Sequence, residues 1–226
     1  MQGGGRIAGW SVSGDKAAEL EQALNGLAAA GENCAWLAVG DGNHALATAK
    51  LCGDWIKTGL TAAEAENHPA RFALAELVNI YDGGIGIEPI HRVITGSNVS
   101  GFGKFAEEFF GQIGEEGEAR ELTVGSANYE YKIVVTGLSV GQMIGASDMM
   151  IAEYLKEHGG AVDYIHDEET AVEMGRKPQS AFILLPAVEK QEIFEAVRSK
   201  ELFPKKSFSI GSARERRYYL ECRRIR

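Results

Sequence analysis

Residues 88–113, EPIHRVITGSNVSGFGKFAEEFFGQI, contain the change of pattern on which the fold assignment rests. Pro89 restricts the residue before it to extended backbone, so EPIHRVIT is expected to be extended. The apolar residues that follow recur with helical spacing, at Phe102, Phe105, Ala106, Phe109, Phe110 and Ile113. This period predicts an amphipathic helix over 99–113 whose aromatic side chains pack into a core.

The same patterns predict further helices and strands on both sides of this stretch. Helices are expected over 15–30, 43–56, 143–158, 167–174 and 189–200. Strands are expected over 6–12, 35–39, 129–135, 162–165, 181–185, 206–210 and 217–224. Residues 71–80 fit either element, and the turn signal that follows them favours a strand. Because the elements intermix without strict alternation, the sequence predicts an α+β or mixed α/β fold, with a mixed sheet and flanking helices.

The domain organisation follows from length and from the absence of breaks. A chain of 226 residues makes one large domain or two small ones, and we expect a single domain over 1–226. No internal repeat and no clear linker interrupts the sequence. Residues 114–125 are acidic and rich in glycine, which makes them the best candidate for a loop and for a seam between subdomains.

Composition excludes several classes of protein. Hydrophobic residues make up 45% of the chain and charged residues 24%, which is ordinary for a globular protein and argues against disorder. The net charge of −9 argues against a general binder of nucleic acid or of anionic membranes. This charge is uneven, since residues 197–226 hold ten Lys or Arg against three Glu.

Three features predict a cytoplasmic protein that is not in a membrane. The three cysteines are widely spaced and include no CxxC pair, which indicates reduced thiols. No apolar run reaches the roughly 18 residues needed to span a bilayer. The first ten residues, MQGGGRIAGW, lack the basic and apolar regions of a secretory signal.

GDGNH, residues 40–44, places an acidic residue between a predicted strand and a predicted helix. Its two glycines allow a tight turn and a close approach of a ligand to the backbone. Free N–H groups and the positive end of the helix dipole attract an anion, phosphate above all, to Gly42, Asn43 and His44. Asp41 could hold Mg²⁺ or act as a base toward a hydroxyl group. In the alternative, Asp41 or Asn43 caps the helix and His44 is an ordinary polar residue.

EPIHR, residues 88–92, gathers a carboxylate, an imidazole and a guanidinium on one extended segment. In a strand, Glu88 and Arg92 point to one face and His91 points to the other. These groups cannot all contact one ligand unless Pro89 bends the strand. Arg92 is a natural fork for a phosphate or a carboxylate, and a surface ion pair is the alternative.

FPKKSFSIG, residues 203–211, brings Lys205, Lys206 and Ser207 together and could bind phosphate. It is not a P-loop, because GxxxxGK[ST] occurs nowhere in the chain. A solvated basic turn is the alternative. We expect part of the C-terminal positive charge to fold back toward the Asp41 loop and to meet a small anion there.

Two further patterns do not lead to a predicted site. GLSVG, residues 137–141, matches the GxSxG elbow of serine hydrolases and is followed by Asp148 and by His158 or His166. No HGGG-type oxyanion motif accompanies it. The histidines and cysteines show neither HExxH nor CxxC spacing, so we predict no transition metal.

Several of these motifs resemble a bacterial and archaeal family known as domain of unknown function number one thousand and fifteen. DGNHA (41–45) resembles the Asp-Gly-His-His-Arg hallmark of that family, in its Asp-Gly-Asn-His variant. EPIHRV (88–93) resembles the Pro-Thr-His-Arg segment, and DYIHDEE (163–169) resembles the Tyr-Ile-His segment. FPKKSFSIG (203–211) resembles the Pro-Arg-Lys-Ser/Thr segment, and RRYYLECRRI (216–225) resembles the ending. Typical members are longer at the N-terminus, which implies that this chain is the C-terminal part of a longer protein.

The family hallmark is in turn similar to motifs of the ParB/sulfiredoxin-like superfamily, which includes ADP-dependent serine kinases and nucleotide-binding ParB proteins. The resemblance therefore implies a ParB/sulfiredoxin-like core and a kinase-like phosphotransferase that uses ADP or ATP with Mg²⁺ on a small hydroxyl substrate. Asp41, as base or Mg²⁺ ligand, with His44 and His91, would be the catalytic residues. Gly42 and Asn43 would cradle the phosphate.

Other cations would complete such a site. Arg92 would line the pocket with His91, while Lys205, Lys206 and Ser207 would close it over the anion. Asn43 replaces a histidine of the hallmark and Ala45 replaces its arginine, so that Arg92 or a lysine would supply the missing cation. The alternative is a non-catalytic regulator that binds a nucleotide or a partner through the same cleft. A DNA-binding module on the basic C-terminus is a further alternative, against which the acidic remainder of the chain argues.

Overall fold

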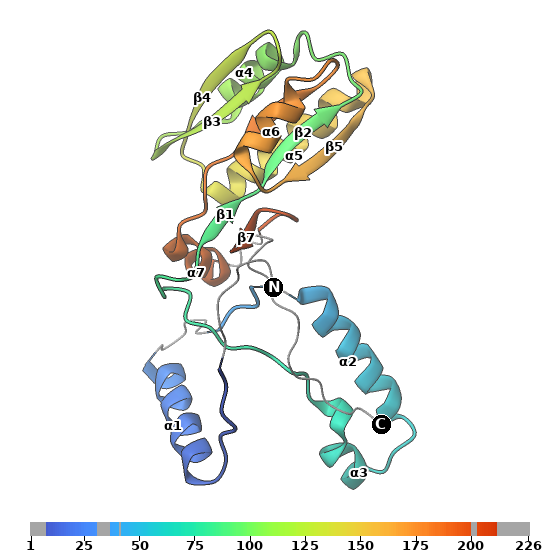
Figure 1. Ribbon diagram of the computed structural model, residues 1–226, viewed down its shortest axis with the longest axis vertical. Helices are drawn as coiled ribbons and strands as arrows, with labels where there is room; N and C mark the ends of the chain where they lie inside the picture. Colours follow the sequence, from blue (N-terminus) through green and yellow to red (C-terminus); the bar gives the residue numbers. More distant parts are fainter. Residues whose placement is uncertain (1–7, 31–36, 41, 200–202, 212–226) are drawn as a thin grey trace. The chain divides into compact units, whose positions relative to one another are not determined.

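The computed structural model describes residues 8–30, 37–40, 42–199 and 203–211 (Figure 1). The chain divides into two compact units. Unit 1 comprises Met1–Gly83 and Ala213–Arg226, and unit 2 comprises Gly84–Ser212. Both helices and strands are present, which confirms the predicted α+β class. The expectation of a single domain over 1–226 stays a prediction.

Unit 1 is helical in its described part. It contains α1 (Asp15–Ala30), α2 (Asn43–Lys57), α3 (Ala62–Asn67) and the 3₁₀ turn η1 (Pro69–Arg71). The two longer helices confirm the predictions over 15–30 and 43–56. Helix α2 passes close to η1 at Gly53, where a Cβ atom would lie only 2.9 Å from the carbonyl oxygen of Ala70. This glycine permits the approach because it has no side chain.

The strands predicted in unit 1 are wrong wherever the structure describes them. Residues 8–12, 37–39 and 72–79 adopt no regular secondary structure, and residues 6–7, 35–36 and 217–224 lie outside the described residues. No described residue of unit 1 is buried, and the side chains of the expected buried strand remain open, with Leu37 49% and Val39 55% exposed. An apolar run favours a strand only where a neighbouring strand supplies hydrogen bonds, and here none does among the described residues.

Unit 2 contains two antiparallel sheets. The smaller one pairs β1 (Ile87–Pro89) with β7 (Phe208–Ile210). The larger one has the order β4-β3-β6-β2-β5. Its strands are β2 (His91–Thr95), β3 (Ala119–Gly125), β4 (Glu130–Thr136), β5 (Ala161–Ile165) and β6 (Ala181–Leu184). The strands predicted near 88–95, 129–135, 162–165, 181–185 and 206–210 are confirmed, but all described pairings are antiparallel, where the sequence suggested a mixed sheet.

Four helices accompany these strands. They are α4 (Phe102–Ile113), α5 (Val140–His158), α6 (Glu168–Gly175) and α7 (Lys190–Arg198), close to the predicted bounds. Helix α6 packs on one face of the large sheet, whereas α4 and α5 lie on the other (Figure 1). The buried core of the described residues belongs to unit 2. Its α6 side joins Val93, Phe182 and Ala171, all 0% exposed.

Strand β3 occupies the segment that we expected to be a loop. The prediction over 114–125 is wrong for Ala119–Gly125, which pairs along its length with β4. Leu122 is 1% and Val124 0% exposed, so alternate residues enter the core. Two charged residues just before them, Arg120 and Glu121, obscured this alternation in the sequence. One of them, Arg120, is held by ion pairs with Glu118 and Glu192.

Two tyrosine hydroxyls hold the glycine- and serine-rich turn that leads from β2 into α4. Tyr129 donates a hydrogen bond to the carbonyl of Val99 at 2.8 Å, and Tyr154 donates one to the carbonyl of Asn98 at 2.7 Å. Burial raises the pKa of Tyr129 to about 12. The N-cap Gly101 has no side chain, so these tyrosines fix the start of the helix instead.

Candidate functional site

The glycine-rich loop before α2 has the backbone that its sequence suggested. Gly42 is the N-cap of α2, with φ 89° and ψ 16°, a left-handed conformation that favours glycine. As a glycine, this N-cap residue supplies no side-chain hydrogen bond to the helix. Asn43 and His44 lie exposed in the first turn. Asp41, the predicted base and Mg²⁺ ligand, lies outside the described residues.

His91 is a buried histidine of unit 2. It begins β2, is 2% exposed, and its Nδ1 accepts a hydrogen bond from the backbone N–H of Leu185 at 3.2 Å. An accepting Nδ1 carries no proton, so the neutral ring is protonated on Nε2. Burial lowers the pKa of His91, with a smaller contribution in the same direction from Arg92. Glu168 and Asp167, at the start of α6, act in the opposite direction.

The lowered pKa of His91 predicts a loss of stability in mild acid. The unfolded ring takes up a proton near pH 6.5, and the folded ring does so only at lower pH. The contribution of the neutral His91 ring to the free energy of unfolding is therefore complete above pH 6.5. It falls as the pH drops from there through the pKa of the folded state. Unfolding free energies of the wild type and of His91→Asn, measured between about pH 8 and pH 5, test this. The asparagine oxygen can accept the same N–H without titrating, and parallel curves for the two proteins would contradict the assignment.

Arg92 is the most completely buried charged group among the described residues. Its side chain is 0% exposed, and Nε and Nη2 donate to the two carboxylate oxygens of Asp148 in α5, at 2.8 and 3.1 Å. Nη1 donates to the carbonyls of Ile90 and Lys206, at 2.6 and 2.8 Å. The guanidinium also lies 4.8 Å from the ring centre of Tyr164. These four hydrogen bonds use most of the five donors of arginine.

Adjacent residues of β2 therefore face opposite sides of the sheet, as the strand period predicted. His91 lies on the α6 side, near Asp167 and Glu168, and Arg92 lies on the α5 side, against Asp148. The chain leaves strand geometry at Ile90, between β1 and β2, but this break does not bring the two side chains together. Glu88 is exposed on β1.

The lysine turn, residues 204–207, lies directly before β7. Lys205 and Lys206 are exposed, and neither forms an ion pair with another described residue. Ser207 is 4% exposed, and its hydroxyl donates to the carbonyl of Pro204 at 2.7 Å. Lys206 has a positive φ of 59°, which is uncommon for a residue with a side chain and costs about 1–2 kcal/mol. The carbonyl that Arg92 binds belongs to this residue.

Unit 2 thus brings together only part of the predicted set. Arg92 contacts the backbone of Lys206, and Ser207 follows in the same turn. His91 lies on the other face of the sheet. Asp41, Gly42, Asn43 and His44 belong to unit 1, and their union with the lysine turn in one site stays a prediction.

Sequence reasoning missed the role of Asp148 as the partner of Arg92. The only signal was an acidic residue within the apolar stripe of the predicted helix, between the buried Ile144 and Ile151. The GxSxG pattern has a structural role, because the Ser139 hydroxyl accepts a hydrogen bond from the backbone N–H of Gln142 and caps α5.

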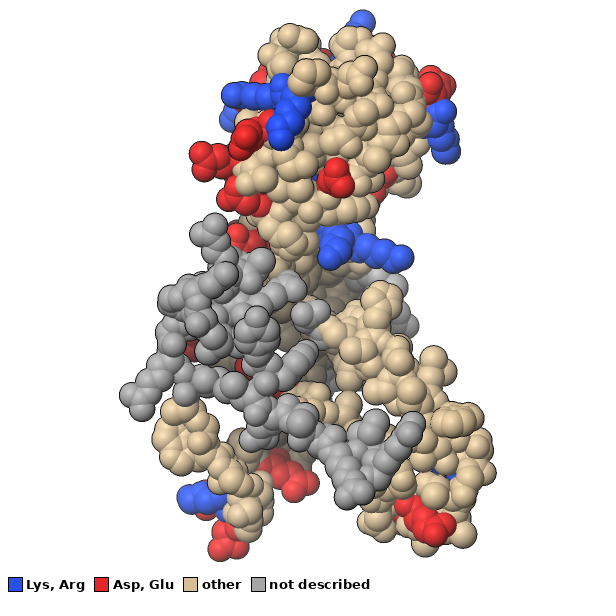
Figure 2. All heavy atoms as spheres, turned by 45° about the vertical axis from the view of Figure 1, so that its right-hand side comes forward, with Lys and Arg blue, Asp and Glu red and all other residues tan. Residues whose placement is uncertain are grey.

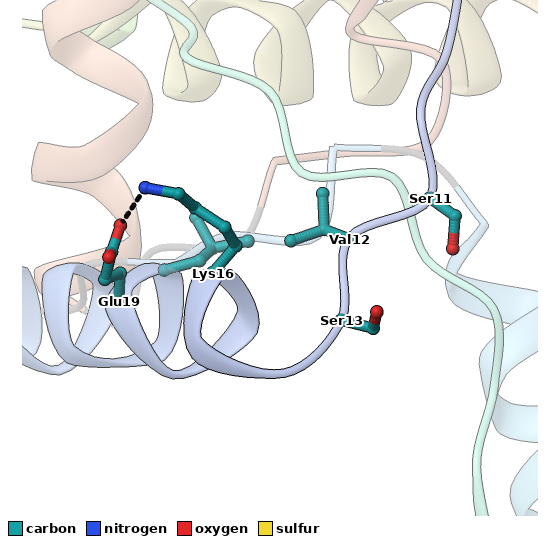
Figure 3. A pocket seen from close by; sticks show the side chains of 6 residues that line it. Ser11, Val12, Ser13, Lys16 and Glu19 are labelled. Carbon is teal, nitrogen blue, oxygen red and sulfur yellow. Dashed lines mark hydrogen bonds and ion pairs between the residues drawn. The ribbon is translucent and has the colours of Figure 1, made fainter.

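Two hollows in the described surface lie away from these residues. One lies beside the first turn of α1 and is lined by Ser11, Val12, Ser13 and Lys16 among others (Figure 3). Lys16 points to Glu19, at 2.7 Å, so this cation is already paired. A second hollow runs between α2 and η1 within unit 1. Neither is lined by a described residue of the predicted site.

The chain matches the model of a known protein family. The family model described as "Protein of unknown function (DUF1015)" matches residues 1–219. No curated protein and no solved structure matches the chain. Among the described residues, no helix is long and apolar enough to cross a membrane.

Proposed function

Since the chain belongs to the DUF1015 family of proteins of unknown function, we propose from its residues that it binds a phosphate-bearing small molecule, with a nucleotide as the preferred class. A kinase-like transfer of phosphate to a small hydroxyl substrate is the reaction that we propose for this ligand. The observation that carries the proposal is the lysine turn of unit 2. It presents two exposed ammonium groups that no described acidic side chain neutralises.

Physical chemistry favours a small anion at such a turn. Two neighbouring ammonium groups create a local positive potential, and a lysine is a compact point charge that suits phosphate oxygens. The turn is also well ordered by contacts within unit 2. Arg92 holds the carbonyl of Lys206, and the ring of Phe203 packs edge-on against that of Phe208, with centres 5.4 Å apart. An ordered turn loses less conformational freedom when a ligand binds.

The loop before α2 provides the second element of the proposal. Gly42, the N-cap of this 15-residue helix, has the left-handed φ of 89°, and a Cβ at this glycine would meet no atom of the described residues within 4 Å. A phosphate group fits such a helix start. In the proposed reaction, Asp41 binds Mg²⁺ or accepts the proton of the hydroxyl substrate, and His44 assists from the exposed first turn.

The net charge of −9 supports a small ligand over a nucleic acid. On the face of the molecule in Figure 2, basic and acidic side chains of the described residues are interspersed rather than gathered by sign. A nucleic-acid binder concentrates Lys and Arg in a patch or stripe.

A second candidate is a nucleotide-binding regulator without turnover. The internal hydrogen bonds of His91 and Arg92 favour it, because both residues were expected to act on the ligand and both are occupied within the fold. In this case the anion would bind to the same turn, and no phosphate would be transferred.

Thermal unfolding of the full chain with ADP, ATP or CTP, with and without Mg²⁺, tests the binding. A nucleotide at 100 times its Kd should add about 2.7 kcal/mol of stability and raise the Tm by several degrees. Lys205→Gln combined with Lys206→Gln should weaken the affinity about tenfold or more. Lys177→Gln is the matched control, because Lys177 is an exposed lysine of unit 2 outside the turn. If no nucleotide at millimolar concentration stabilises the protein, the proposed function is wrong.

Turnover separates the two candidates. For a transferase, the protein should consume nucleotide in the presence of a hydroxyl substrate, and Asp41→Asn should abolish this while leaving nucleotide affinity within a few-fold. For a regulator, nucleotide stabilises the protein, and no conversion accumulates in either variant.

A further inference from the structure

We propose that Arg92 is a positioning residue, which fixes Lys206 for the anion instead of contacting the anion itself. This inference rests on the proposed function, since it concerns how the lysine turn binds its ligand. It changes the role expected from the sequence, in which Arg92 was the fork that grips the phosphate.

The guanidinium of Arg92 is enclosed by acceptors of the protein itself. Its side chain is fully buried, and the N–H groups that point away from β2 are directed to carbonyl and carboxylate oxygens of the protein. A phosphate would have to displace Asp148 or a backbone carbonyl in order to be gripped. The bidentate pair with a carboxylate is the arrangement that competes best with a phosphate for arginine.

Lys206 has a left-handed backbone conformation. A lysine with φ 59° persists only where the surroundings hold it, and the described contact that does so is the bond from Arg92 Nη1 to its carbonyl oxygen. The same nitrogen binds the carbonyl of Ile90, so the guanidinium links the start of the large sheet to the lysine turn. The direction of the Lys206 side chain therefore depends on Arg92.

Asp148 orients the guanidinium of Arg92. Its two oxygens orient Nε and Nη2, which leaves Nη1 aimed at the turn. This arrangement gives the two hypotheses opposite expectations for Asp148→Asn. If Arg92 contacts the anion, removal of the competing negative charge strengthens anion binding. If Arg92 positions the turn, loss of the bidentate carboxylate loosens it and weakens binding.

The first test uses the ligand-free full chain. Amide hydrogen exchange of peptides covering 203–211 is compared between the wild type, Arg92→Lys, Asp148→Asn and the apolar double variant Arg92→Met with Asp148→Leu. We expect exchange in this segment to accelerate in each variant about tenfold more than exchange in β3 and β4 does. Lysine cannot replace the arginine, because one ammonium group cannot reach Asp148 and both carbonyls together. The apolar pair keeps the core filled if a single variant fails to fold.

The second test measures the Kd of pyrophosphate for the same proteins. We expect Arg92→Lys and Asp148→Asn each to weaken binding about tenfold, and their double variant to weaken it by little more than either. Lys206→Gly is the matched variant at the ligand end. Amide exchange over 203–211 should stay slow in this variant, because glycine adopts the same φ readily. Its affinity for pyrophosphate should still fall, because the ammonium group is gone.

The outcomes separate the two proposals. Wild-type exchange over 203–211 in Arg92→Lys and Asp148→Asn, or tighter pyrophosphate binding by Asp148→Asn, would overturn the positioning role. A wild type that binds neither pyrophosphate nor nucleotide would overturn the proposed function, and the exchange measurement would still decide whether Arg92 fixes the turn. Lys206→Gly with unchanged affinity would place the anion away from this lysine and overturn the positioning role.

Discussion

Phe182→Ala is expected to lower the free energy of unfolding of unit 2 by about 3–5 kcal/mol. Phe182 is 0% exposed at the middle of the large sheet, where it contacts Val93 and Ala171. Its ring also rests on two glycines, since a Cβ built on Gly125 would collide with it and one on Gly175 would lie 2.5 Å from its Cβ. The alanine leaves a cavity that these glycines cannot fill, because they have no side chains.

The measurement must report on unit 2. All three tryptophans, Trp10, Trp36 and Trp55, belong to residues 1–83, so tryptophan fluorescence follows the other unit. Amide exchange of peptides from β3, β6 and α6 gives the opening free energy where the change is made. Phe182→Leu is the control and should cost roughly 1 kcal/mol. A loss below about 1.5 kcal/mol in Phe182→Ala would mean that Phe182 does not organise this core.

Asp148→Ala is expected to cost unit 2 about 3–5 kcal/mol, because it leaves the buried guanidinium of Arg92 without a counter-charge. The side chain of Asp148 is 29% exposed while that of Arg92 is 0% exposed, so the desolvation cost of an unpaired charge is greater for the arginine. Arg92→Met should therefore cost less than Asp148→Ala, since it leaves a carboxylate that water can reach.

The double variant Arg92→Met with Asp148→Leu is the matched control for the ion pair. Removal of both charges avoids an uncompensated buried group, and apolar side chains of similar volume can replace a buried pair at little cost. We expect most of the stability lost in Asp148→Ala to return, as read from amide exchange in α5 and β2. If the double variant is as unstable as Asp148→Ala, packing and not charge is what the aspartate provides.

Local pattern predicted unit 2 well and unit 1 in part. The aromatic stripe at 102–113 and the apolar run at 181–185 became α4 and β6, because each pattern coincides with a face that packs against other elements. The run at 35–39, AWLAV, is as uniformly apolar as β6, AFIL, but has no described strand beside it. A strand depends on partners distant in the sequence, and that information is absent from a window of a few residues.

The sequence predicted those features of the site that follow from the two-residue period of a strand. Alternation along β2 foretold that His91 and Arg92 face opposite sides, and the contacts confirm it. The partner of Arg92 could not be foretold, because Asp148 is 56 residues away and meets it only through the packing of α5 on the sheet. The positive φ of Lys206 was equally invisible, since the residue that binds its carbonyl, Arg92, is 114 residues away.

The strand order of the large sheet also bears on how the chain is made. Strand β6 lies between β3 and β2, although it is the last of the five to leave the ribosome. At about 5–20 residues per second, β2 and β3 wait several seconds for their common neighbour during synthesis. During this interval, the edges of β2 and β3 that later pair with β6 have not yet met that strand. A nascent chain stalled before residue 181 should therefore recruit chaperones, and one stalled late enough to expose β6 should release them.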